Sequence, residues 1–91
     1  MTVKSVYYSV TAYYPSRLFL TPEGRRKEEL IESLARKSKG RIIGGGNTLV
    51  GSRPLRDLQF AFHSEADANR FISRLKTRHI RRSRASRREL W

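Results

Sequence analysis

The sequence predicts a ferredoxin-like α+β sandwich, a two-layer fold in which two helices cover one face of an antiparallel sheet. Three observations predict it: segments in which apolar and polar residues alternate, segments with apolar residues at helical spacing, and the order of these segments. That order is strand, helix, strand, strand, helix, and 91 residues suffice for one such domain. A fourth strand is either a weak edge strand or missing, because residues 77–84 contain one apolar side chain, Ile80.

The first strand is expected between Val3 and Tyr14, a run rich in Val, Tyr and Thr that Pro15 ends. Alternation along this strand separates a face expected to be buried from an open one. The buried face holds Val6, Tyr8, Val10 and Ala12, and the open face holds Tyr7, Ser9, Thr11 and Tyr13. If the fourth strand is missing, this first strand has a free edge, and a homodimer through that edge is expected.

The first helix is expected to begin at Thr21 and Pro22. Threonine accepts a hydrogen bond from the free amides of a first helical turn, and proline is tolerated in that turn. Apolar residues at helical spacing then give the helix one buried stripe, formed by Leu30, Ile31, Leu34 and Ala35. Gly40 follows a lysine-rich last turn and is expected to end the helix.

The second half of the domain is expected to contain two further strand regions and a helix. Residues 41–50 predict a bulged strand or two short strands, because the glycine-rich run 44–47 separates two apolar pairs. The third strand is expected over residues 58–63, in which large apolar side chains alternate with smaller or polar ones. Ser64 has the spacing of a helix cap, and the apolar stripe of the second helix stops at Leu75.

The charge of the chain predicts a polyanionic partner. The net charge is +12, from 20 Lys and Arg against 8 Asp and Glu, and eight of the basic residues fall between Arg74 and Trp91 with one acid. We therefore divide the chain into an α+β domain over residues 1–76 and a basic, arginine-rich segment over residues 77–91. Nucleic acid is the expected partner and an acidic protein the second choice. No membrane partner is expected, because the basic segment has too few apolar residues for a buried face.

The arginine-rich segment is the main candidate for binding nucleic acid, because a guanidinium binds phosphate bidentately and also stacks on bases. Basic residues of the domain are expected to extend its footprint, and aromatic residues of the open sheet face can stack on unpaired bases. The candidate nucleic-acid-binding residues are Arg74, Lys76, Arg78, Arg81, Arg82, Arg84, Arg87, Arg88, Arg41, Arg53, Arg56, Tyr7 and Tyr13.

One short segment resembles a known family. Residues 60–71, in which Phe60 and Phe62 precede Ser64 and a helix that contains Phe71, are similar to the third strand and second helix of RNA recognition motif domains. The resemblance implies the ferredoxin-like arrangement and single-stranded bases stacked on the open face of the sheet.

Two other functions stay open at this point. The chain is also compatible with a small protein-interaction or inhibitor module that docks a basic face or a strand edge on a partner. A metal-free ribonuclease would use His63 as its acid or base. The sequence shows no catalytic constellation, no metal-ligand cluster and no cofactor motif, so no catalytic residue, metal or cofactor is predicted. The absence of cysteine predicts a cytoplasmic, intracellular protein.

Overall fold

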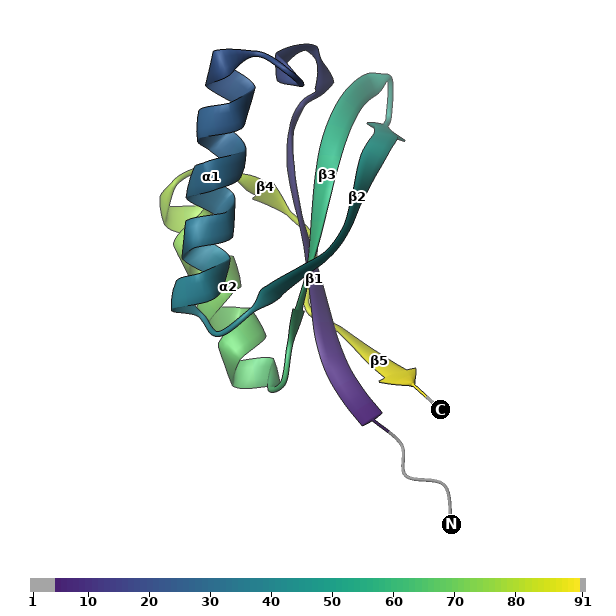
Figure 1. Ribbon diagram of the computed structural model, residues 1–91. Helices are drawn as coiled ribbons and strands as arrows, with labels where there is room; N and C mark the ends of the chain where they lie inside the picture. The colour runs from purple at the N-terminus through teal and green to yellow at the C-terminus, as the bar shows by residue number, and fades with distance from the viewer. Residues whose placement is uncertain (1–4, 91) are drawn as a thin grey trace.

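The computed structural model describes residues 5–90 and has the expected order of elements (Figure 1). The elements are β1 (Ser5–Pro15), a 3₁₀ turn η1 (Ser16–Leu18), α1 (Pro22–Lys37), β2 (Arg41–Val50), β3 (Arg53–Phe62), α2 (Glu65–Thr77), β4 (Arg81–Arg82) and β5 (Ser86–Leu90). Both helix starts are capped as expected: the Thr21 Oγ accepts from the Gly24 amide at 3.0 Å, and the Ser64 Oγ accepts from the Asp67 amide at 3.1 Å.

The sheet is antiparallel, with strand order β2-β3-β1-β4 and with β5 also paired to β1. Both helices lie in one layer on the same face of this sheet (Figure 1). The ferredoxin-like α+β sandwich is therefore confirmed, and its fourth strand is present as two pieces.

The two pieces of the fourth strand are joined by a bulge. β4 places Arg82 opposite Ala12, whereas β5 places Ser86 opposite Ser9, so the register differs by one residue between them. Ser83 sits in the bulge and bonds to Thr11 twice: its amide donates to the Thr11 carbonyl at 2.8 Å, and its Oγ accepts from the Thr11 amide at 2.9 Å. These bonds hold the chain against β1 where the regular ladder is interrupted.

The position of β4 and β5 corrects two expectations. Residues 81–82 and 86–90 are strands of the sheet, so the described part of the basic segment is built into the α+β domain. In the described chain β1 is flanked by β3 on one side and, as far as Tyr13, by β4 and β5 on the other, so it lacks the long free edge on which the expected homodimer depended. Within residues 5–90, β2 is one outer strand of the sheet, and β4 with β5 form the opposite edge.

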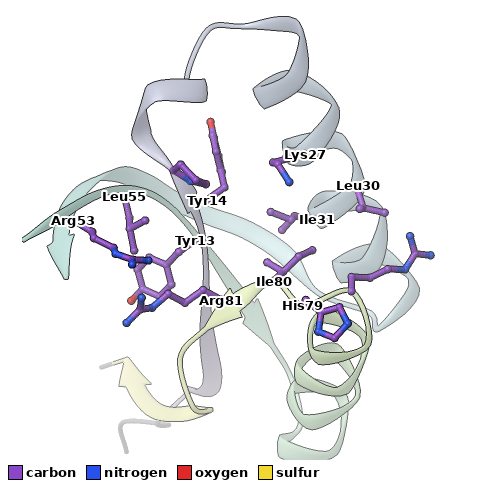
Figure 2. Close-up of a pocket in the computed structure, with 12 residues that line it drawn as sticks. Tyr13, Tyr14, Lys27, Leu30, Ile31, Arg53, Leu55, His79, Ile80 and Arg81 are labelled. Atoms are coloured by element: carbon purple, nitrogen blue, oxygen red, sulfur yellow. The ribbon is translucent and has the colours of Figure 1, made fainter. Parts of the chain in front are cut away.

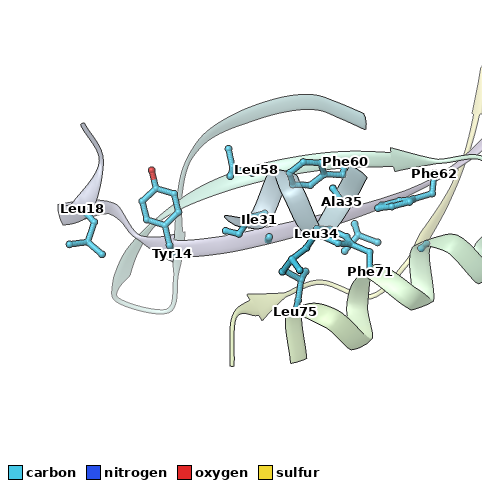
Figure 3. Close-up of a cluster of buried hydrophobic side chains, with 13 residues drawn as sticks. Tyr14, Leu18, Ile31, Leu34, Ala35, Leu58, Phe60, Phe62, Phe71 and Leu75 are labelled. Carbon is cyan, nitrogen blue, oxygen red and sulfur yellow. The ribbon is translucent and has the colours of Figure 1, made fainter. Parts of the chain in front are cut away.

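The core lies between the helices and the sheet (Figure 3). Val10 and Ala12 are fully buried as expected, whereas Val6 and Tyr8 at the other end of β1 are only partly buried. The Phe71 ring of α2 packs on two rings of β3, with centroid distances of 5.1 Å to Phe60 and 5.2 Å to Phe62. The complete cluster is Val10, Ala12, Tyr14, Leu18, Ile31, Leu34, Ala35, Leu58, Phe60, Phe62, Ala68, Phe71 and Leu75.

Gly40 is needed for a different reason from the one expected. The left-handed residue that ends α1 is Lys39, with φ of 64°, and the Gly40 amide donates to the Ala35 carbonyl at 2.8 Å. A Cβ on Gly40 would lie 2.3 Å from the Phe62 ring. Glycine is therefore required there by close packing against the core rather than by its backbone angles. α2 ends in the same type of turn, with His79 at φ of 57°.

Candidate nucleic-acid interface

The face of the sheet opposite the helices, called here the open face, collects both tyrosines and four arginines of the candidate set. Residues paired across antiparallel strands point to the same face. Tyr7 pairs with Arg88, and Tyr13 pairs with Arg81 on one side and with Asp57 on the other. Arg53 alternates in phase with Asp57 along β3, and Arg41 begins β2 opposite Ala61, which pairs with Ser9 of the same face. The four arginines are exposed and both tyrosines are partly buried.

The bulge between β4 and β5 is what puts both Arg81 and Arg88 on the open face. These two positions are seven residues apart, and an odd separation along an unbroken strand would place them on opposite faces. The one-residue shift restores the phase, so Arg88 faces the same way as Tyr7.

The residues form two groups at opposite ends of the open face. The Tyr7 group consists of Tyr7, Arg88 and Arg41, and Tyr7 and Arg41 line a hollow of about 200 Å³ together with His63. The Tyr13 group consists of Tyr13, Arg81 and Arg53, and Figure 2 shows the guanidinium ends of both arginines beside the Tyr13 ring. The two tyrosines are six positions apart along β1, a distance of roughly 20 Å.

Small or neutral side chains occupy the surface between the two groups. Thr11 pairs with Gln59, and Gln59 pairs with Gly44 on the outer strand. Asp57 is acidic and lies at one end of this surface, where it pairs with Tyr13, but it is only 8% exposed. A Cβ on Gly46 would lie 3.9 Å from both carboxylate oxygens of Asp57, so the Asp57 side chain covers this glycine. The surface between the groups therefore has few protruding side chains.

Other members of the candidate set point elsewhere. Arg82 pairs with Ala12 and Arg87 pairs with Tyr8, which places both on the helix side of the sheet. Arg82 Nη1 donates to the Ile80 carbonyl at 3.1 Å, and Arg87 forms an ion pair with Glu89. Arg84 lies in the bulge and is exposed, while Lys76 and Arg78 lie at the end of α2. Of these residues, only Arg78 is brought near the Tyr13 group, because it lines a cavity together with Tyr13, Arg53 and Arg81.

Arg74 connects the two helices. Its Nη1 donates to the Ser38 Oγ at 2.8 Å, and the Ser38 Oγ donates to the Leu34 carbonyl at 3.0 Å. Ser38 is fully buried at the C-terminal end of α1, where a cation also interacts favourably with the helix dipole. We therefore assign Arg74 a role in helix packing, which the sequence pattern did not indicate.

Arg56 also packs against other residues of the domain. Its guanidinium carbon lies 4.1 Å from the centroid of the Phe19 ring, and its Nε is buried without a hydrogen-bond partner. Arg56 pairs with Tyr14, whose hydroxyl donates a hydrogen bond to the Glu28 carboxylate of α1. Burial of the phenol, together with the Glu28 bond and charge, raises the pKa of Tyr14 to about 12.

This raised pKa predicts an alkaline loss of stability. The neutral Tyr14 phenol is favoured in the folded state, so its contribution is complete below pH 10, the ordinary tyrosine pKa, and is lost as the pH rises through about 12. We expect tyrosinate absorbance to show an ionisation step near pH 12 that the Tyr14→Phe variant lacks. The unfolding free energy of the wild type should also fall more steeply between pH 10 and 12. Identical high-pH titration curves for the two proteins would contradict this assignment.

The histidines lie in different hollows. His63 is exposed beside Tyr7 and Arg41, and His79 lines a cavity at the Tyr13 end. Among residues 5–90 no three His, Asp or Glu side chains gather where they could hold a metal ion. Within the same residues, neither helix has the length and apolar character needed to cross a membrane.

The comparisons with known proteins bear on the fold alone. No protein-family model matches the sequence, and no curated protein is significantly similar to it. The de novo designed protein Foldit4 is similar in structure with a TM-score of 0.52 at 7% identity, over 98% of this chain and 98% of that one. A mutant chlorite dismutase from Candidatus Nitrospira defluvii also gives a TM-score of 0.52, at 15% identity, over 99% of this chain but 42% of the enzyme.

A third solved structure, a NIPSNAP family protein of unknown function from Agrobacterium tumefaciens, has a TM-score of 0.44 at 15% identity over 93% of this chain and 86% of that one. This chain spans less than half the length of the chlorite dismutase. At such low identities, the two structures with a TM-score of 0.52 support the α+β arrangement alone and carry no information about activity.

Proposed function

We propose that the protein binds single-stranded nucleic acid on the open face of its sheet. One observation carries the proposal: each of the two tyrosines on this face lies in a group with two exposed arginines. An aromatic ring stacks on an unpaired base, and a neighbouring guanidinium binds the adjoining phosphate. The proposal moves the centre of the expected site from the arginine-rich segment as a whole to those arginines that share a face with Tyr7 and Tyr13.

The arrangement favours single strands over duplexes. In a duplex the faces of the bases are stacked on one another and are not available to a tyrosine, whereas every base of a single strand has a free face. The separation of roughly 20 Å between the tyrosines requires one strand to span several nucleotides in order to reach both groups. The intervening surface, with few protruding side chains, leaves room for that strand. Base stacking does not distinguish RNA from DNA, so both polymers are candidates.

A salt titration with three labelled probes tests the proposal. The probes are single-stranded RNA, single-stranded DNA and duplex DNA, each long enough to contact both tyrosine groups. Four arginine–phosphate contacts on a single strand predict that log Kd rises with log salt with a slope of about 3, so affinity should fall about 50-fold between about 0.05 and 0.2 M salt. We expect both single strands to bind more tightly than the duplex. Preference for the duplex, or affinity that does not change with salt, would contradict the proposal.

The same titration addresses the competing function, a protein-interaction module. The outer strand β2 exposes Ile42, Ile43 and Leu49, with exposed fractions of 49%, 43% and 71%. A partner strand could therefore add at β2, whereas the edge of β1 is covered. Failure of all three nucleic-acid probes to bind would favour that function over nucleic-acid binding.

A further inference from the structure

A cavity of about 340 Å³ lies at the edge of the sheet beyond β4, where Tyr13 of the open face and residues of the helix layer both line it (Figure 2). It exists because β4 is only two residues long: β4 pairs with Ala12 and Tyr13, and within the described chain Tyr14 and Pro15 pair only with β3. Helix α1 and the turn between α2 and β4 provide the remaining walls.

The walls of the cavity combine an apolar interior with a cationic rim. Ile31 of α1 and Ile80 of the turn both line the cavity (Figure 2), and Leu30 and Leu55 extend the apolar surface. The basic residues of the rim are Lys27, Arg53, Arg78 and Arg81, with His79 beside them. None of the described residues that line the cavity is acidic.

The turn after α2 holds this wall in place. His79 has φ of 57°, its amide donates to the Lys76 carbonyl at 3.0 Å, and the Ile80 amide donates to the Leu75 carbonyl at 3.0 Å. These two bonds form a Schellman motif, in which the residue after the left-handed one packs back on the helix. Ile80 is accordingly packed against the core, so one side of the cavity is preformed.

We infer that this cavity binds one nucleotide unit, with the base between Tyr13 and the aliphatic wall and the phosphate at Arg53 and Arg81. An apolar interior suits a planar ring, and a rim of arginines suits an anion attached to that ring. The volume lies near the lower end of the range for small-molecule sites, which is appropriate for one nucleotide. The inference rests on the proposed function and assigns the Tyr13 group a specific ligand, either a free mononucleotide or the terminal nucleotide of a strand.

The test uses the full chain and three small probes: adenosine monophosphate, adenosine and inorganic phosphate. Titrations followed by the amide signals of the ¹⁵N-labelled protein should show saturable binding of the monophosphate, with the largest shifts at Tyr13, Leu30 and Ile80. Adenosine and inorganic phosphate should each bind at least about tenfold more weakly, because each lacks one of the two recognised parts.

Two variants and one matched control locate the site. Arg81→Gln should lower the affinity for the monophosphate about tenfold, the effect of losing one charge-assisted hydrogen bond. Arg36→Gln removes the same charge from an exposed position of α1 that does not line the cavity, and it should leave this affinity unchanged. Leu30→Trp should fill the cavity and abolish binding, with unchanged thermal unfolding as the check on its fold. Leu30→Phe serves as the smaller replacement if the tryptophan variant is unstable.

The outcomes separate this inference from the proposed function. If the protein binds single strands but not the monophosphate, the inference is overturned and the proposed function is not. The same holds if inorganic phosphate binds as tightly as the monophosphate. Monophosphate binding without single-strand binding would overturn the proposed function and leave the cavity as a mononucleotide site. Competition by a linear 5′-phosphorylated strand, but not by the same strand closed into a circle, identifies a strand terminus as the ligand. No competition by either strand identifies the free mononucleotide.

Discussion

Replacing Gly24 with alanine is expected to lower the free energy of unfolding by at least about 3 kcal/mol. Helix propensity alone predicts a higher free energy of unfolding, because alanine is favoured over glycine in a helix interior by about 1 kcal/mol. The new Cβ, however, would lie 1.9 Å from the carbonyl oxygen of Leu18 and 2.7 Å from its carbonyl carbon. That carbonyl accepts hydrogen bonds from both the amide and the hydroxyl of Thr21, and Leu18 is buried in the core, so the turn cannot move away cheaply.

Urea unfolding followed by circular dichroism measures this effect. Gly44→Ala is the matched control, because its Cβ would meet the Gln59 side chain at ordinary contact distances, 3.5 Å to Oε1 and 3.8 Å to Cδ. We expect the control to change the unfolding free energy by less than about 1 kcal/mol. A Gly24→Ala variant as stable as the wild type would show that the η1 turn adapts and that the contact between η1 and α1 is not rigid.

The second large effect is expected for nucleic-acid binding. A variant with glutamine at Arg41, Arg53, Arg81 and Arg88 should bind single-stranded RNA about 100-fold more weakly at moderate salt, because each replacement removes one charge-assisted contact to phosphate. The dependence of log Kd on log salt should flatten at the same time, since fewer counterions are released on binding.

The control for this variant removes the same number of charges from the other layer. Glutamine at Arg25, Arg26, Arg36 and Lys37 lowers the net charge equally at exposed positions of α1. We expect this control to retain affinity within about threefold of the wild type, because distant exposed charges are largely screened. Equal losses in the two variants would mean that net charge, and not the open face, determines binding.

Local patterns in the sequence predicted most of the fold, and long-range pairing determined the rest. The burial of Val10 and Ala12 and the caps at Thr21 and Ser64 depend on neighbours along the chain, so alternation and spacing indicated them. The fourth strand lacks such a pattern, because it pairs through its backbone and through the bonds of Ser83 to Thr11. Pairing through backbone groups does not require apolar side chains, so the apolar pattern of the sequence does not reveal it.

The candidate site was predicted in its residue types but not in its grouping. Composition identified the arginines, and alternation placed Tyr7 and Tyr13 on one face. Composition could not show that Arg56 packs on Phe19 or that Arg74 bonds to Ser38, because both contacts join distant parts of the chain. Composition also could not show which of Arg87 and Arg88 lies on the open face, since this depends on the position of the bulge.

The bulge therefore lets the register of one short strand set the charge at one end of a surface. If β5 continued the register of β4 without the one-residue shift, Arg88 would lie opposite Val6 and Arg87 opposite Tyr7, so the side chains of residues 86–89 would exchange faces. Arg88 would turn toward the helices, and Arg87 and Glu89 would take its place with no net charge between them. A slip of one residue would in this way remove one of the two cationic ends of the open face without replacing any of the residues that form it.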